Sequence, residues 1–549
     1  MMSAEHLSVL GFIVPLNCIH LMLGGGIAAG SQTLCGRYVG SGNRKKIGEV
    51  YSTAFVLCTF IGILLSMIYF LFPYQIASIL GASGNALEYI VDYLRGYAGS
   101  VVFLLFSSIV IPFLQLSNAT KVMLVSILTL TVTNVAFVII SISVFQSGMF
   151  GVGLACSLSN ILGAAVVLIY CLSSKCPIHF SLKSFRFQHV KQIFYLGLPN
   201  TVKPFCLAIR NWVFNNVAVQ YGGVMAISAL TIVGNVGSII DSITGGVEGA
   251  TCMISSIYYG ERDKKSLQDV TPVALKTGVP LQAAMYILIF LLARPIAQLF
   301  GLQGEEIGFT ANAMRIVLLY LIGNIYMNVY INVYKGIGKT RFVSIVTVIN
   351  HILIPILFCL TATKIIGING VWISYVVPEP LCFIGLLIYS ACKQHHFPKS
   401  LAELTYIPDN FGIEDNDHYN VKIMNVREIS RVSQDVQEFC KKRGMDSKKS
   451  FYCALCIEEL AAAVLTETPG LMNKIVRNKE IDLLLIYEDE GMSILMRNNY
   501  PPFDPIEWAN IHDAVDPMKS VGIRMVSKFA KEASYSAVIN LNLFYVRIV

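Results

Sequence analysis

The stretch from residue 24 to residue 50 occurs twice in this chain. GGGIAAGSQTLCGRYVGSGNRKKIGEV returns as TGGVEGATCMISSIYYGERDKKSLQDV from Thr244, at a constant offset of 220 residues without a gap, so that Gly40 corresponds to Gly260. Each copy is an apolar helix with glycines that ends in a small basic loop. Duplication within a hydrophobic chain is typical of transporters, whose sites lie between the repeats. The sequence therefore predicts a membrane part made of two related halves.

The composition places most of the chain in a bilayer. Its 549 residues are 55% hydrophobic and 14% charged, with a mean hydropathy of +0.62, which exceeds what a soluble domain needs. Residues 1–400 hold 24 Lys and Arg against 12 Asp and Glu, whereas 420–549 hold 17 of each. The net charge of +7 therefore comes from loops flanking the membrane. No nucleic-acid partner is predicted.

Eleven apolar runs are long enough to span a bilayer. They cover residues 7–34, 48–72, 93–116, 121–145, 151–173, 192–219, 226–257, 270–299, 309–334, 341–362 and 368–391. Loops after alternate runs are basic, such as Arg44-Lys45-Lys46 and the segment from Lys335 to Arg341. The intervening loops 73–90, 146–150, 220–224 and 300–308 contain no Lys or Arg. The positive-inside bias predicts a plasma-membrane (inner-membrane) protein whose basic loops and C-terminus are cytoplasmic.

The offset of the repeat explains the odd number of spans. The run at 192–219 opens the second half, and its counterpart would precede residue 1, so a first helix is expected to be missing or not needed. With it, each half has six spans inserted in the same sense, which predicts two pseudo-symmetric lobes around a central cavity. We assign 1–180 to the N-terminal lobe, 181–395 to the C-terminal lobe, 396–420 to a linker and 421–549 to a soluble domain.

The last 129 residues, 421–549, change to an α+β pattern. VKIMNVR alternates like a strand, helices are expected over 428–443, 447–467 and 517–533, and a hairpin is expected to turn at Glu490-Gly491. AVINLNLFYVRIV supplies one or two closing strands. The predicted fold class is an all-α polytopic bundle followed by a cytoplasmic α+β domain.

Charged residues inside spans are costly and mark candidate sites. Lys203 and Arg210 are seven residues apart on one helix face, and Asp241 and Glu248 share this spacing on the next, antiparallel helix. The two pairs are either a switchable ion or proton site or a static network that joins the two helices. Asp241 is the best single candidate because it lies well inside its span. Glu248 aligns with Ala28 in the first half, so its acid is no repeat-wide packing feature.

Several asparagines are further candidates. Asn134 and Asn350 occupy corresponding places in the two halves. Asn324, Asn328 and Asn332 recur every four residues on one helix face. They line a polar path or pack between helices through hydrogen bonds.

Three isolated polar residues in apolar runs and one cysteine pair are the remaining candidates. Glu379 lies between two prolines in the last span and marks either a broken helix near a cavity or a local kink. His20 and His351 fit hydrogen-bonded structural residues better than proton carriers. Cys453 and Cys456 form the one close cysteine pair, and without a second ligand pair they fit small hydrophobes better than a zinc or redox site.

The doubled motif, Gly197-Leu198-Pro199 and the helix starts GVGLAC and GVWISY resemble the MATE (multidrug and toxic compound extrusion) family over roughly residues 1–395. The resemblance implies twelve helices in two lobes, alternating access, no cofactor, and export of small amphipathic or organic-ion compounds in exchange for Na⁺ or H⁺. The family's acid on the first helix is absent. Apolar residues near Leu207 replace an acid found in some members, and Val138 replaces an Asp.

The domain 421–549 resembles the anti-sigma-factor kinases of the histidine-kinase-like ATPase superfamily. Glu459 stands at the acid position of CALCIEELAAAV, but Ala463 replaces the metal-binding Asn. The adenine-pocket motif, an Asp and then a Gly before a Pro-Phe, is represented by the segment from Asn498 through Tyr500 to Asp504, in which both the Asp and the Gly are gone. The lid glycine survives as Gly522. This vestigial nucleotide site argues against ATP hydrolysis. The domain is expected to sense a nucleotide without turnover or to dock a regulatory protein.

Three functions fit these features. The first is a secondary-active exporter of organic compounds with a regulatory tail, which is not an enzyme. The second keeps the fold but moves a lipid-linked saccharide, as related flippases do. The third is a membrane receptor whose tail binds a regulatory protein. Drug accumulation in cells without other efflux pumps separates the first from the third.

Overall fold

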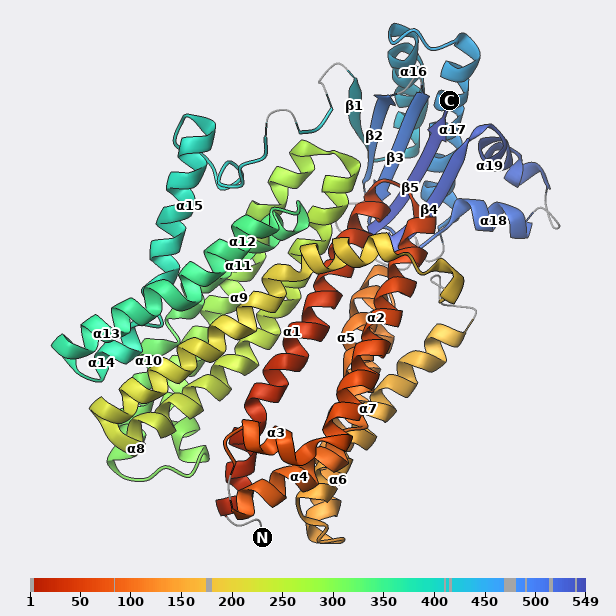
Figure 1. Ribbon diagram of the computed structural model, residues 1–549. Coiled ribbons are helices and arrows are strands. Elements are labelled where there is room, and N and C mark those ends of the chain that lie inside the picture. The colour runs from red at the N-terminus through yellow and green to blue at the C-terminus, as the bar shows by residue number, and fades with distance from the viewer. Residues whose placement is uncertain are drawn as a thin grey trace.

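The computed structural model describes residues 4–82, 84–173, 180–408, 411–413, 417–468, 480–488, 491–512, 517–538 and 541–549. Long helices form a bundle, and a five-stranded sheet with its own helices caps one end of it (Figure 1). We call the sheet and its helices, residues 418–549, the C-terminal module. The predicted division into an all-helical part and an α+β part is present in the fold.

The first part of the bundle contains seven α-helices and a short 3₁₀ turn among the described residues. They are α1 (Ala4–Gly40), α2 (Arg44–Leu71), α3 (Pro73–Ile79), α4 (Asn85–Tyr97), α5 (Ser100–Leu116), α6 (Thr120–Ser143), α7 (Gly148–Leu172) and the 3₁₀ turn Leu182–Ser184. The predicted span at 93–116 is divided between α4 and α5, which are bent by 56° at their junction.

The second part begins with α8 (Phe187–Glu261), which contains both predicted spans 192–219 and 226–257. Gly223 interrupts it with φ 62° and ψ −154°, a conformation that only glycine adopts readily. The remaining elements are α9 (Lys264–Leu299), α10 (Glu305–Val317), α11 (Tyr320–Gly336), α12 (Thr340–Val348), a π-helical turn η2 (Ile349–Leu353), α13 (Ile354–Ile366), α14 (Asn369–Ile373) and α15 (Pro378–Gln394).

Eight helical segments in the described residues are long and apolar enough to cross a membrane, or nine if the bent α4–α5 pair is one span. The predicted number of eleven spans stays a prediction. Large apolar side chains are exposed along α2, α6 and α9, including Phe60, Val132 and Leu291 at 64–68% exposure. Such surfaces are stable only against lipid.

Helices α1 and α8 pack at backbone distance because glycines remove the side chains between them. Gly40 lies directly against the carbonyl of Ile257, and Gly260 lies directly against the carbonyl of Arg37. Under the repeat offset, Arg37 corresponds to Ile257 and Gly40 to Gly260, so the two contacts are reciprocal. Gly36 similarly faces its own counterpart, Ser256. A two-fold relation between the copies produces such contacts.

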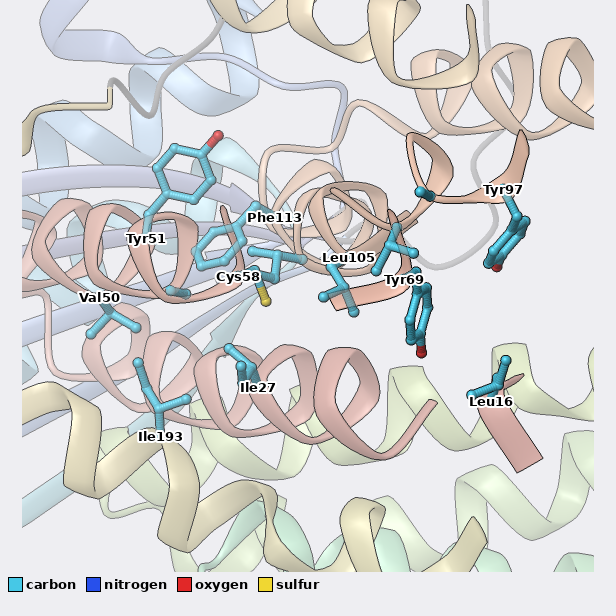
Figure 2. Close-up of a cluster of buried hydrophobic side chains, with 14 of the residues drawn as sticks. Leu16, Ile27, Val50, Tyr51, Cys58, Tyr69, Tyr97, Leu105, Phe113 and Ile193 are labelled. Atoms are coloured by element: carbon cyan, nitrogen blue, oxygen red, sulfur yellow. The ribbon is translucent and has the colours of Figure 1, made fainter. Parts of the chain in front are cut away.

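The first part of the bundle is filled by apolar and aromatic side chains. Figure 2 shows this cluster, to which α1, α2, α4, α5 and α8 contribute Leu16, Ile27, Val50, Tyr51, Cys58, Tyr69, Tyr97, Leu105, Phe113 and Ile193. The rings of Tyr51 and Phe113 meet edge to face, with centroids 4.6 Å apart. His20 lies at this cluster and shares a 3.0 Å hydrogen bond with the Tyr69 hydroxyl. His20 itself lines neither of the cavities described below.

The C-terminal module is an antiparallel sheet in the order β1-β2-β3-β5-β4. Its elements are β1 (His418–Ile423), α16 (Val426–Lys442), α17 (Ser447–Glu467), β2 (Ile481–Glu488), β3 (Gly491–Asn498), α18 (Pro505–His512), α19 (Pro517–Phe529), β4 (Glu532–Val538) and β5 (Leu541–Ile548). The sequence predicted each helix of 428–443, 447–467 and 517–533 to within a few residues. Residue 490 of the predicted hairpin turn lies outside the described residues.

The two faces of the sheet bury different partners. Alternate residues such as Leu483, Leu485 and Ile494 pack against the helices of the module. The opposite residues face the bundle, and Val538 and Leu543 join the apolar cluster of α1, α2 and α5. Both sheet faces are therefore covered, which explains the nearly continuous apolar run in β2.

Candidate functional site

A cavity of about 620 Å³ lies among α8, α11, η2 and α15. It is lined by nearly all the charged and amide side chains that the sequence singled out inside spans, namely Lys203, Arg210, Asp241, Glu248, Asn324, Asn328, Asn350, His351 and Glu379. We call it the polar cavity. Every residue lining it falls between 203 and 379, so it is built by the second repeat half. The sequence had placed it between the halves.

The four charges of α8 face this cavity from both sides of the Gly223 break. Lys203 and Arg210 precede the break, and Asp241 and Glu248 follow it. Among the described residues, no ion pair within 4.0 Å joins these four. A static network that joins the two segments is therefore not formed in this arrangement, and the charges remain available to a ligand.

Two tyrosines contact charged side chains of α8 in the polar cavity. Tyr320 donates a hydrogen bond to the Asp241 carboxylate, with its hydroxyl 3.3 Å from each oxygen. The Arg210 guanidinium lies 4.9 Å from the centroid of the Tyr375 ring, a cation–π contact. Arg210 Nε is buried without a hydrogen-bond partner in the described structure. Sequence reasoning missed both tyrosines, because an aromatic residue in an apolar span carries no signal of its own.

Asn350 and His351 lie in the π-helical turn η2, just before Pro355. A single π turn inside a helix shifts side chains out of the regular spacing and is frequent at functional sites. Asn350 Nδ2 donates to Glu379 Oε1 at 3.3 Å. Asn350 Oδ1 and Glu379 Oε2 are buried without a hydrogen-bond partner in the described structure. Buried polar atoms without a protein partner are typically satisfied by a ligand, an ion or water.

Glu379 occupies the first turn of α15, after a break that separates α15 from α14. The segment Asn369–Gln394 still counts as one apolar span, and at the start of α15 it brings a 5% exposed carboxylate to the cavity. Gly323 of α11 lies directly against the Glu379 side chain, where a Cβ would not fit. The broken-helix alternative for Glu379 stays a prediction.

The three asparagines of α11 form a hydrogen-bonded ladder. Asn328 Nδ2 donates to Asn324 Oδ1 at 2.9 Å, and Asn332 Nδ2 donates to the Asn328 carbonyl at 2.8 Å. Lys335 Nζ donates to Asn332 Oδ1 at 3.0 Å. Lys335 had been assigned to a basic loop, but it is on α11 and extends the ladder. Its spacing of three from Asn332 places it on the same face, a signal that the sequence contained.

A second cavity of about 250 Å³ continues the ladder towards α1. It shares Lys203, Glu248, Asn328 and His351 with the polar cavity and adds Asn332 and Lys335. Leu21 and Gly25 of α1 close it, so here the first half does contribute to the wall. Lys203, Arg210 and Lys335 carry three positive charges into the two cavities, and Asp241, Glu248 and Glu379 carry three negative ones. Protonation of any carboxyl group or entry of an ion therefore changes the net charge of the two cavities.

Asn134 is not part of this site. Its Nδ2 lies 3.1 Å from Ser159 Oγ and 3.5 Å from Cys156 Sγ, between α6 and α7. The correspondence with Asn350 therefore reflects position in the repeat and not a shared cavity. Asn134 fits the interhelical-packing alternative.

The residues predicted to form a vestigial nucleotide site contact other side chains of the module. Gly522 of α19 lies directly against the Glu459 carboxylate of α17, with no room for a Cβ. Asn498 accepts hydrogen bonds from Asn542 Nδ2 at 2.8 Å and from the amide of Tyr500 at 3.2 Å. Ala463 is buried in the core of the module.

Among the described residues, no group of three or more His, Cys, Asp and Glu side chains is arranged to hold a metal ion. Cys453 and Cys456 are both buried in the core of the module. They pack there as small apolar side chains, as one of the two sequence alternatives proposed.

A buried ionic cluster, which sequence reasoning missed, joins the module to the bundle. Arg497 of β3 places Nη1 2.9 Å from Glu261 Oε2 and 2.9 Å from Asp263 Oδ2, and it also pairs with Asp482. The Arg497 and Glu261 side chains are 3% and 0% exposed. The guanidinium also covers the Tyr258 ring at 5.1 Å. A signal existed, since Glu261 and Asp263 replace Ser41 and Asn43 of the first repeat copy.

The cluster contains one cation and three acids, so its protonation is uneven. Burial raises the pKa of Glu261 to about 7, against the attraction of Arg497. Burial also acts on Asp263, but Arg497 and hydrogen bonds from Ser266 outweigh it and lower the pKa of that carboxyl group. The surrounding carboxylates raise the pKa of Arg497, although burial opposes them. Glu261 is therefore the member of the cluster that changes charge near neutral pH.

The MatE family model matches residues 1–140 and 199–361 of this chain. Relatives include the multidrug export protein MepA of Staphylococcus saprophyticus, 22% identical over 73% of this chain and 89% of its own length. The probable multidrug resistance protein YoeA of Bacillus subtilis is 23% identical over 66% of this chain and 80% of its own length.

Two solved structures share the fold of the bundle. One is an outward-facing multidrug resistance MATE family transporter of the MOP superfamily, with a TM-score of 0.67, 20% identity, and coverage of 70% of this chain and 87% of that one. The other is a MOP superfamily transporter from Pyrococcus furiosus described as having a binding pocket of reverse polarity, with a TM-score of 0.67, 19% identity, and coverage of 74% and 90%. The chain is a multi-pass membrane protein that belongs to the MatE family.

Proposed function

We propose that the chain exports small amphipathic or organic-ion compounds across the plasma membrane in exchange for Na⁺ or H⁺. The observation that carries the proposal is the polar cavity, in which Asp241, Glu248 and Glu379 face Lys203 and Arg210 without an ion pair among the four charges of α8. Membership of the MatE family and the names of the MepA and YoeA relatives support export of several compounds.

The charges of the cavity supply a coupling mechanism. A proton or Na⁺ at Asp241 or Glu248 and a cationic substrate compete for the same carboxylates, so both do not bind favourably at once. Each ligand then favours one arrangement of the two repeat halves, and their different affinities drive exchange. The two halves are proposed to form two lobes that move relative to each other.

The module-bearing end of the bundle is proposed to be cytoplasmic. The turns at this end carry Arg44, Lys45, Lys46, Lys264 and Lys265. Basic residues accumulate on the cytoplasmic side of membrane proteins. The module is proposed to regulate transport without hydrolysing ATP, because Gly522 of the expected nucleotide lid lies directly against the Glu459 carboxylate, with no room between them for even a Cβ.

The experiment measures efflux of a fluorescent lipophilic cation from proteoliposomes under an imposed pH or Na⁺ gradient. Asp241→Asn is expected to lower the initial rate about tenfold, because loss of this charge interaction is worth roughly 1.4 kcal/mol. Asp92→Asn is the matched control, since Asp92 lies on α4 outside both cavities. Equal rates for the two variants would contradict the proposal. The gradient that drives efflux identifies the coupling ion.

A second candidate function has one observation in its favour. Lys203, Arg210 and Lys335 line the two cavities, and three cations suit an anionic head group such as that of a lipid-linked saccharide. The same proteoliposomes distinguish the candidates. If Lys203→Gln and Arg210→Gln abolish movement of an anionic lipid analogue and leave the lipophilic cation unaffected, the chain is a flippase.

A further inference from the structure

The module contacts both turns that the repeat relates. The α1–α2 turn (residues 41–43) and the α8–α9 turn (residues 261–263) are equivalent under the offset of 220. Each follows the close-packed glycine of its helix, Gly40 or Gly260. The sheet therefore touches corresponding points of the two halves at the same end of the bundle, as Figure 1 shows for the α1–α2 turn below β4 and β5.

The contact with the α1–α2 turn is largely apolar. Gly42, at φ 70°, lies directly against the ring of Tyr545, and an added Cβ would overlap that ring. Ser534 Oγ donates to the Gly42 carbonyl at 3.1 Å. Val538 and Leu543 enter the cluster of α1, α2 and α5, where they are 1% and 7% exposed. This side of the module is held mainly by burial of apolar surface.

The contact with the α8–α9 turn is ionic. Arg497 reaches Glu261 at the end of α8 and Asp263 before α9, and Arg262 between them pairs with Glu488 at 2.7 Å. Asp263 also caps α9 by accepting from the amide of Ser266 at 2.9 Å. The ion pairs of Arg497 are almost fully buried. If Arg497 leaves, the buried carboxylates lose their countercharge, which is costly.

The helices between these turns are closed at this end. Gly36, Gly40 and Gly260 bring α1 and α8 to backbone contact directly before the two turns. If the two halves separate here, the two turns move apart, and the sheet cannot follow both. Either the apolar contact or the ionic contact must then open.

We propose that the C-terminal module has a function of its own as a clamp, which binds both repeat-equivalent turns at once and so holds the cytoplasmic ends of α1 and α8 together. The clamp rests on the proposed export function, because only a transporter needs these ends to part. We place the first opening at the ionic contact, because its strength depends on the charges of its members, whereas that of the apolar contact does not. Opening at the cytoplasmic side then depends on whether Arg497 remains paired with Glu261 and Asp263.

The test measures two distances by spin labels in the full chain in nanodiscs. The labels are placed through non-natural amino acids, because the chain contains 14 cysteines. Labels at Lys45 and Lys265, exposed and repeat-equivalent, report the separation of the halves. Labels at Lys265 and Lys422, which line one cavity at the junction, report docking of the module.

Three variants are compared with the wild type. Arg497→Ala removes the ionic contact and is expected to lower the docked-to-undocked ratio about 100-fold. Leu543→Ala weakens the apolar contact and gives a second route to undocking if the first variant folds poorly. Arg443→Ala is the control, because Arg443 pairs with Asp417 at 3.3 Å inside the module and does not contact either turn.

Undocking in Arg497→Ala or Leu543→Ala, together with a new population of longer Lys45–Lys265 distances, supports the clamp. Undocking without that population overturns it, because the helix ends then stay closed without the module. Failure of both variants to undock also overturns it, because the two contacts then do not hold the module. The distances need no transport, so they test the clamp even if Asp241→Asn shows that the export proposal is wrong.

Discussion

The α1–α2 turn and the α8–α9 turn share a backbone and differ in chemistry. In both, a left-handed residue follows the helix, Gly42 at φ 70° and Arg262 at φ 58°. In both, the next residue caps the following helix, Asn43 towards Lys46 and Asp263 towards Ser266. The first turn nevertheless receives aromatic and aliphatic side chains of the module, while the second receives an arginine.

The difference shows how a duplicated fold acquires separate tasks. The backbone of each copy is fixed by glycines at close contacts and by caps, which tolerate few replacements. Positions that face a cavity or the module are free to diverge. Ala28 is 7% exposed in an apolar environment, whereas its counterpart Glu248 faces the polar cavity. The charged site is therefore confined to one half although the fold is shared by both.

The largest expected effect tests the shared backbone. Gly260→Ala introduces a Cβ directly against the Arg37 carbonyl, whereas Gly246→Ala meets nothing within 4 Å. The first is expected to destabilise the protein by about 1–3 kcal/mol through overpacking. The second is expected to be neutral or to stabilise by up to about 1 kcal/mol through helix propensity. Thermal unfolding in detergent measures both, and similar shifts would show that the close contact is not required.

The next effect separates the two turns by pH. Burial raises the pKa of Glu261 from its ordinary 4.5 to about 7, so the docked state binds this proton more tightly than the undocked state. The resulting stabilisation of docking is fully present below pH 4.5 and is lost as the pH rises through about 7. Arg497, Asp263, Asp482 and Tyr258 surround the group.

The Lys265–Lys422 distance, followed from pH 5.5 to 8.5, measures this dependence. Glu261→Gln is expected to remain docked over the whole range, because the amide cannot ionise. Leu543→Ala provides the comparison, since it weakens the module's other contact without changing a charged group. A wild-type profile that is flat, or one that tightens as the pH rises, would show that Glu261 does not control docking.

The smallest effect is expected from replacing Arg262, the residue with left-handed backbone conformation in the α8–α9 turn. Arg262→Gly removes about 1–2 kcal/mol of backbone strain but adds about 0.5–1 kcal/mol of chain entropy. It also loses the pair with Glu488, whose partners are 53% and 49% exposed, so that this pair contributes little. The net change in unfolding free energy is expected to be below about 1 kcal/mol. Gly42→Ala is expected to cost more, because the Tyr545 ring occupies the space of the Cβ. Equal effects in a denaturation series would contradict the difference between the turns.

Periodicity and the repeat predicted the helices well because long apolar runs have no other stable arrangement in a bilayer. The range 447–467 coincides with α17, and 121–145 lies within two residues of α6 at each end. The same patterns placed Lys203, Arg210, Asp241, Glu248 and Glu379 among the site candidates, since each charge is costly in an apolar span. They also selected Asn134, whose polar partners Ser159 and Cys156 lie on α7 and remove it from the cavity.

The sequence by itself determined the membrane character of the chain, its duplication, the α+β module and the charged residues inside apolar spans. These features depend on composition and on spacing along one helix. Only the tertiary structure decided that the charges share a cavity within the second half, that Tyr320 and Tyr375 hold two of them, and that Arg497 joins the module to the α8–α9 turn. These contacts connect residues up to 236 positions apart. No local pattern encodes such pairs, because they arise from the packing of elements that meet only in the folded molecule.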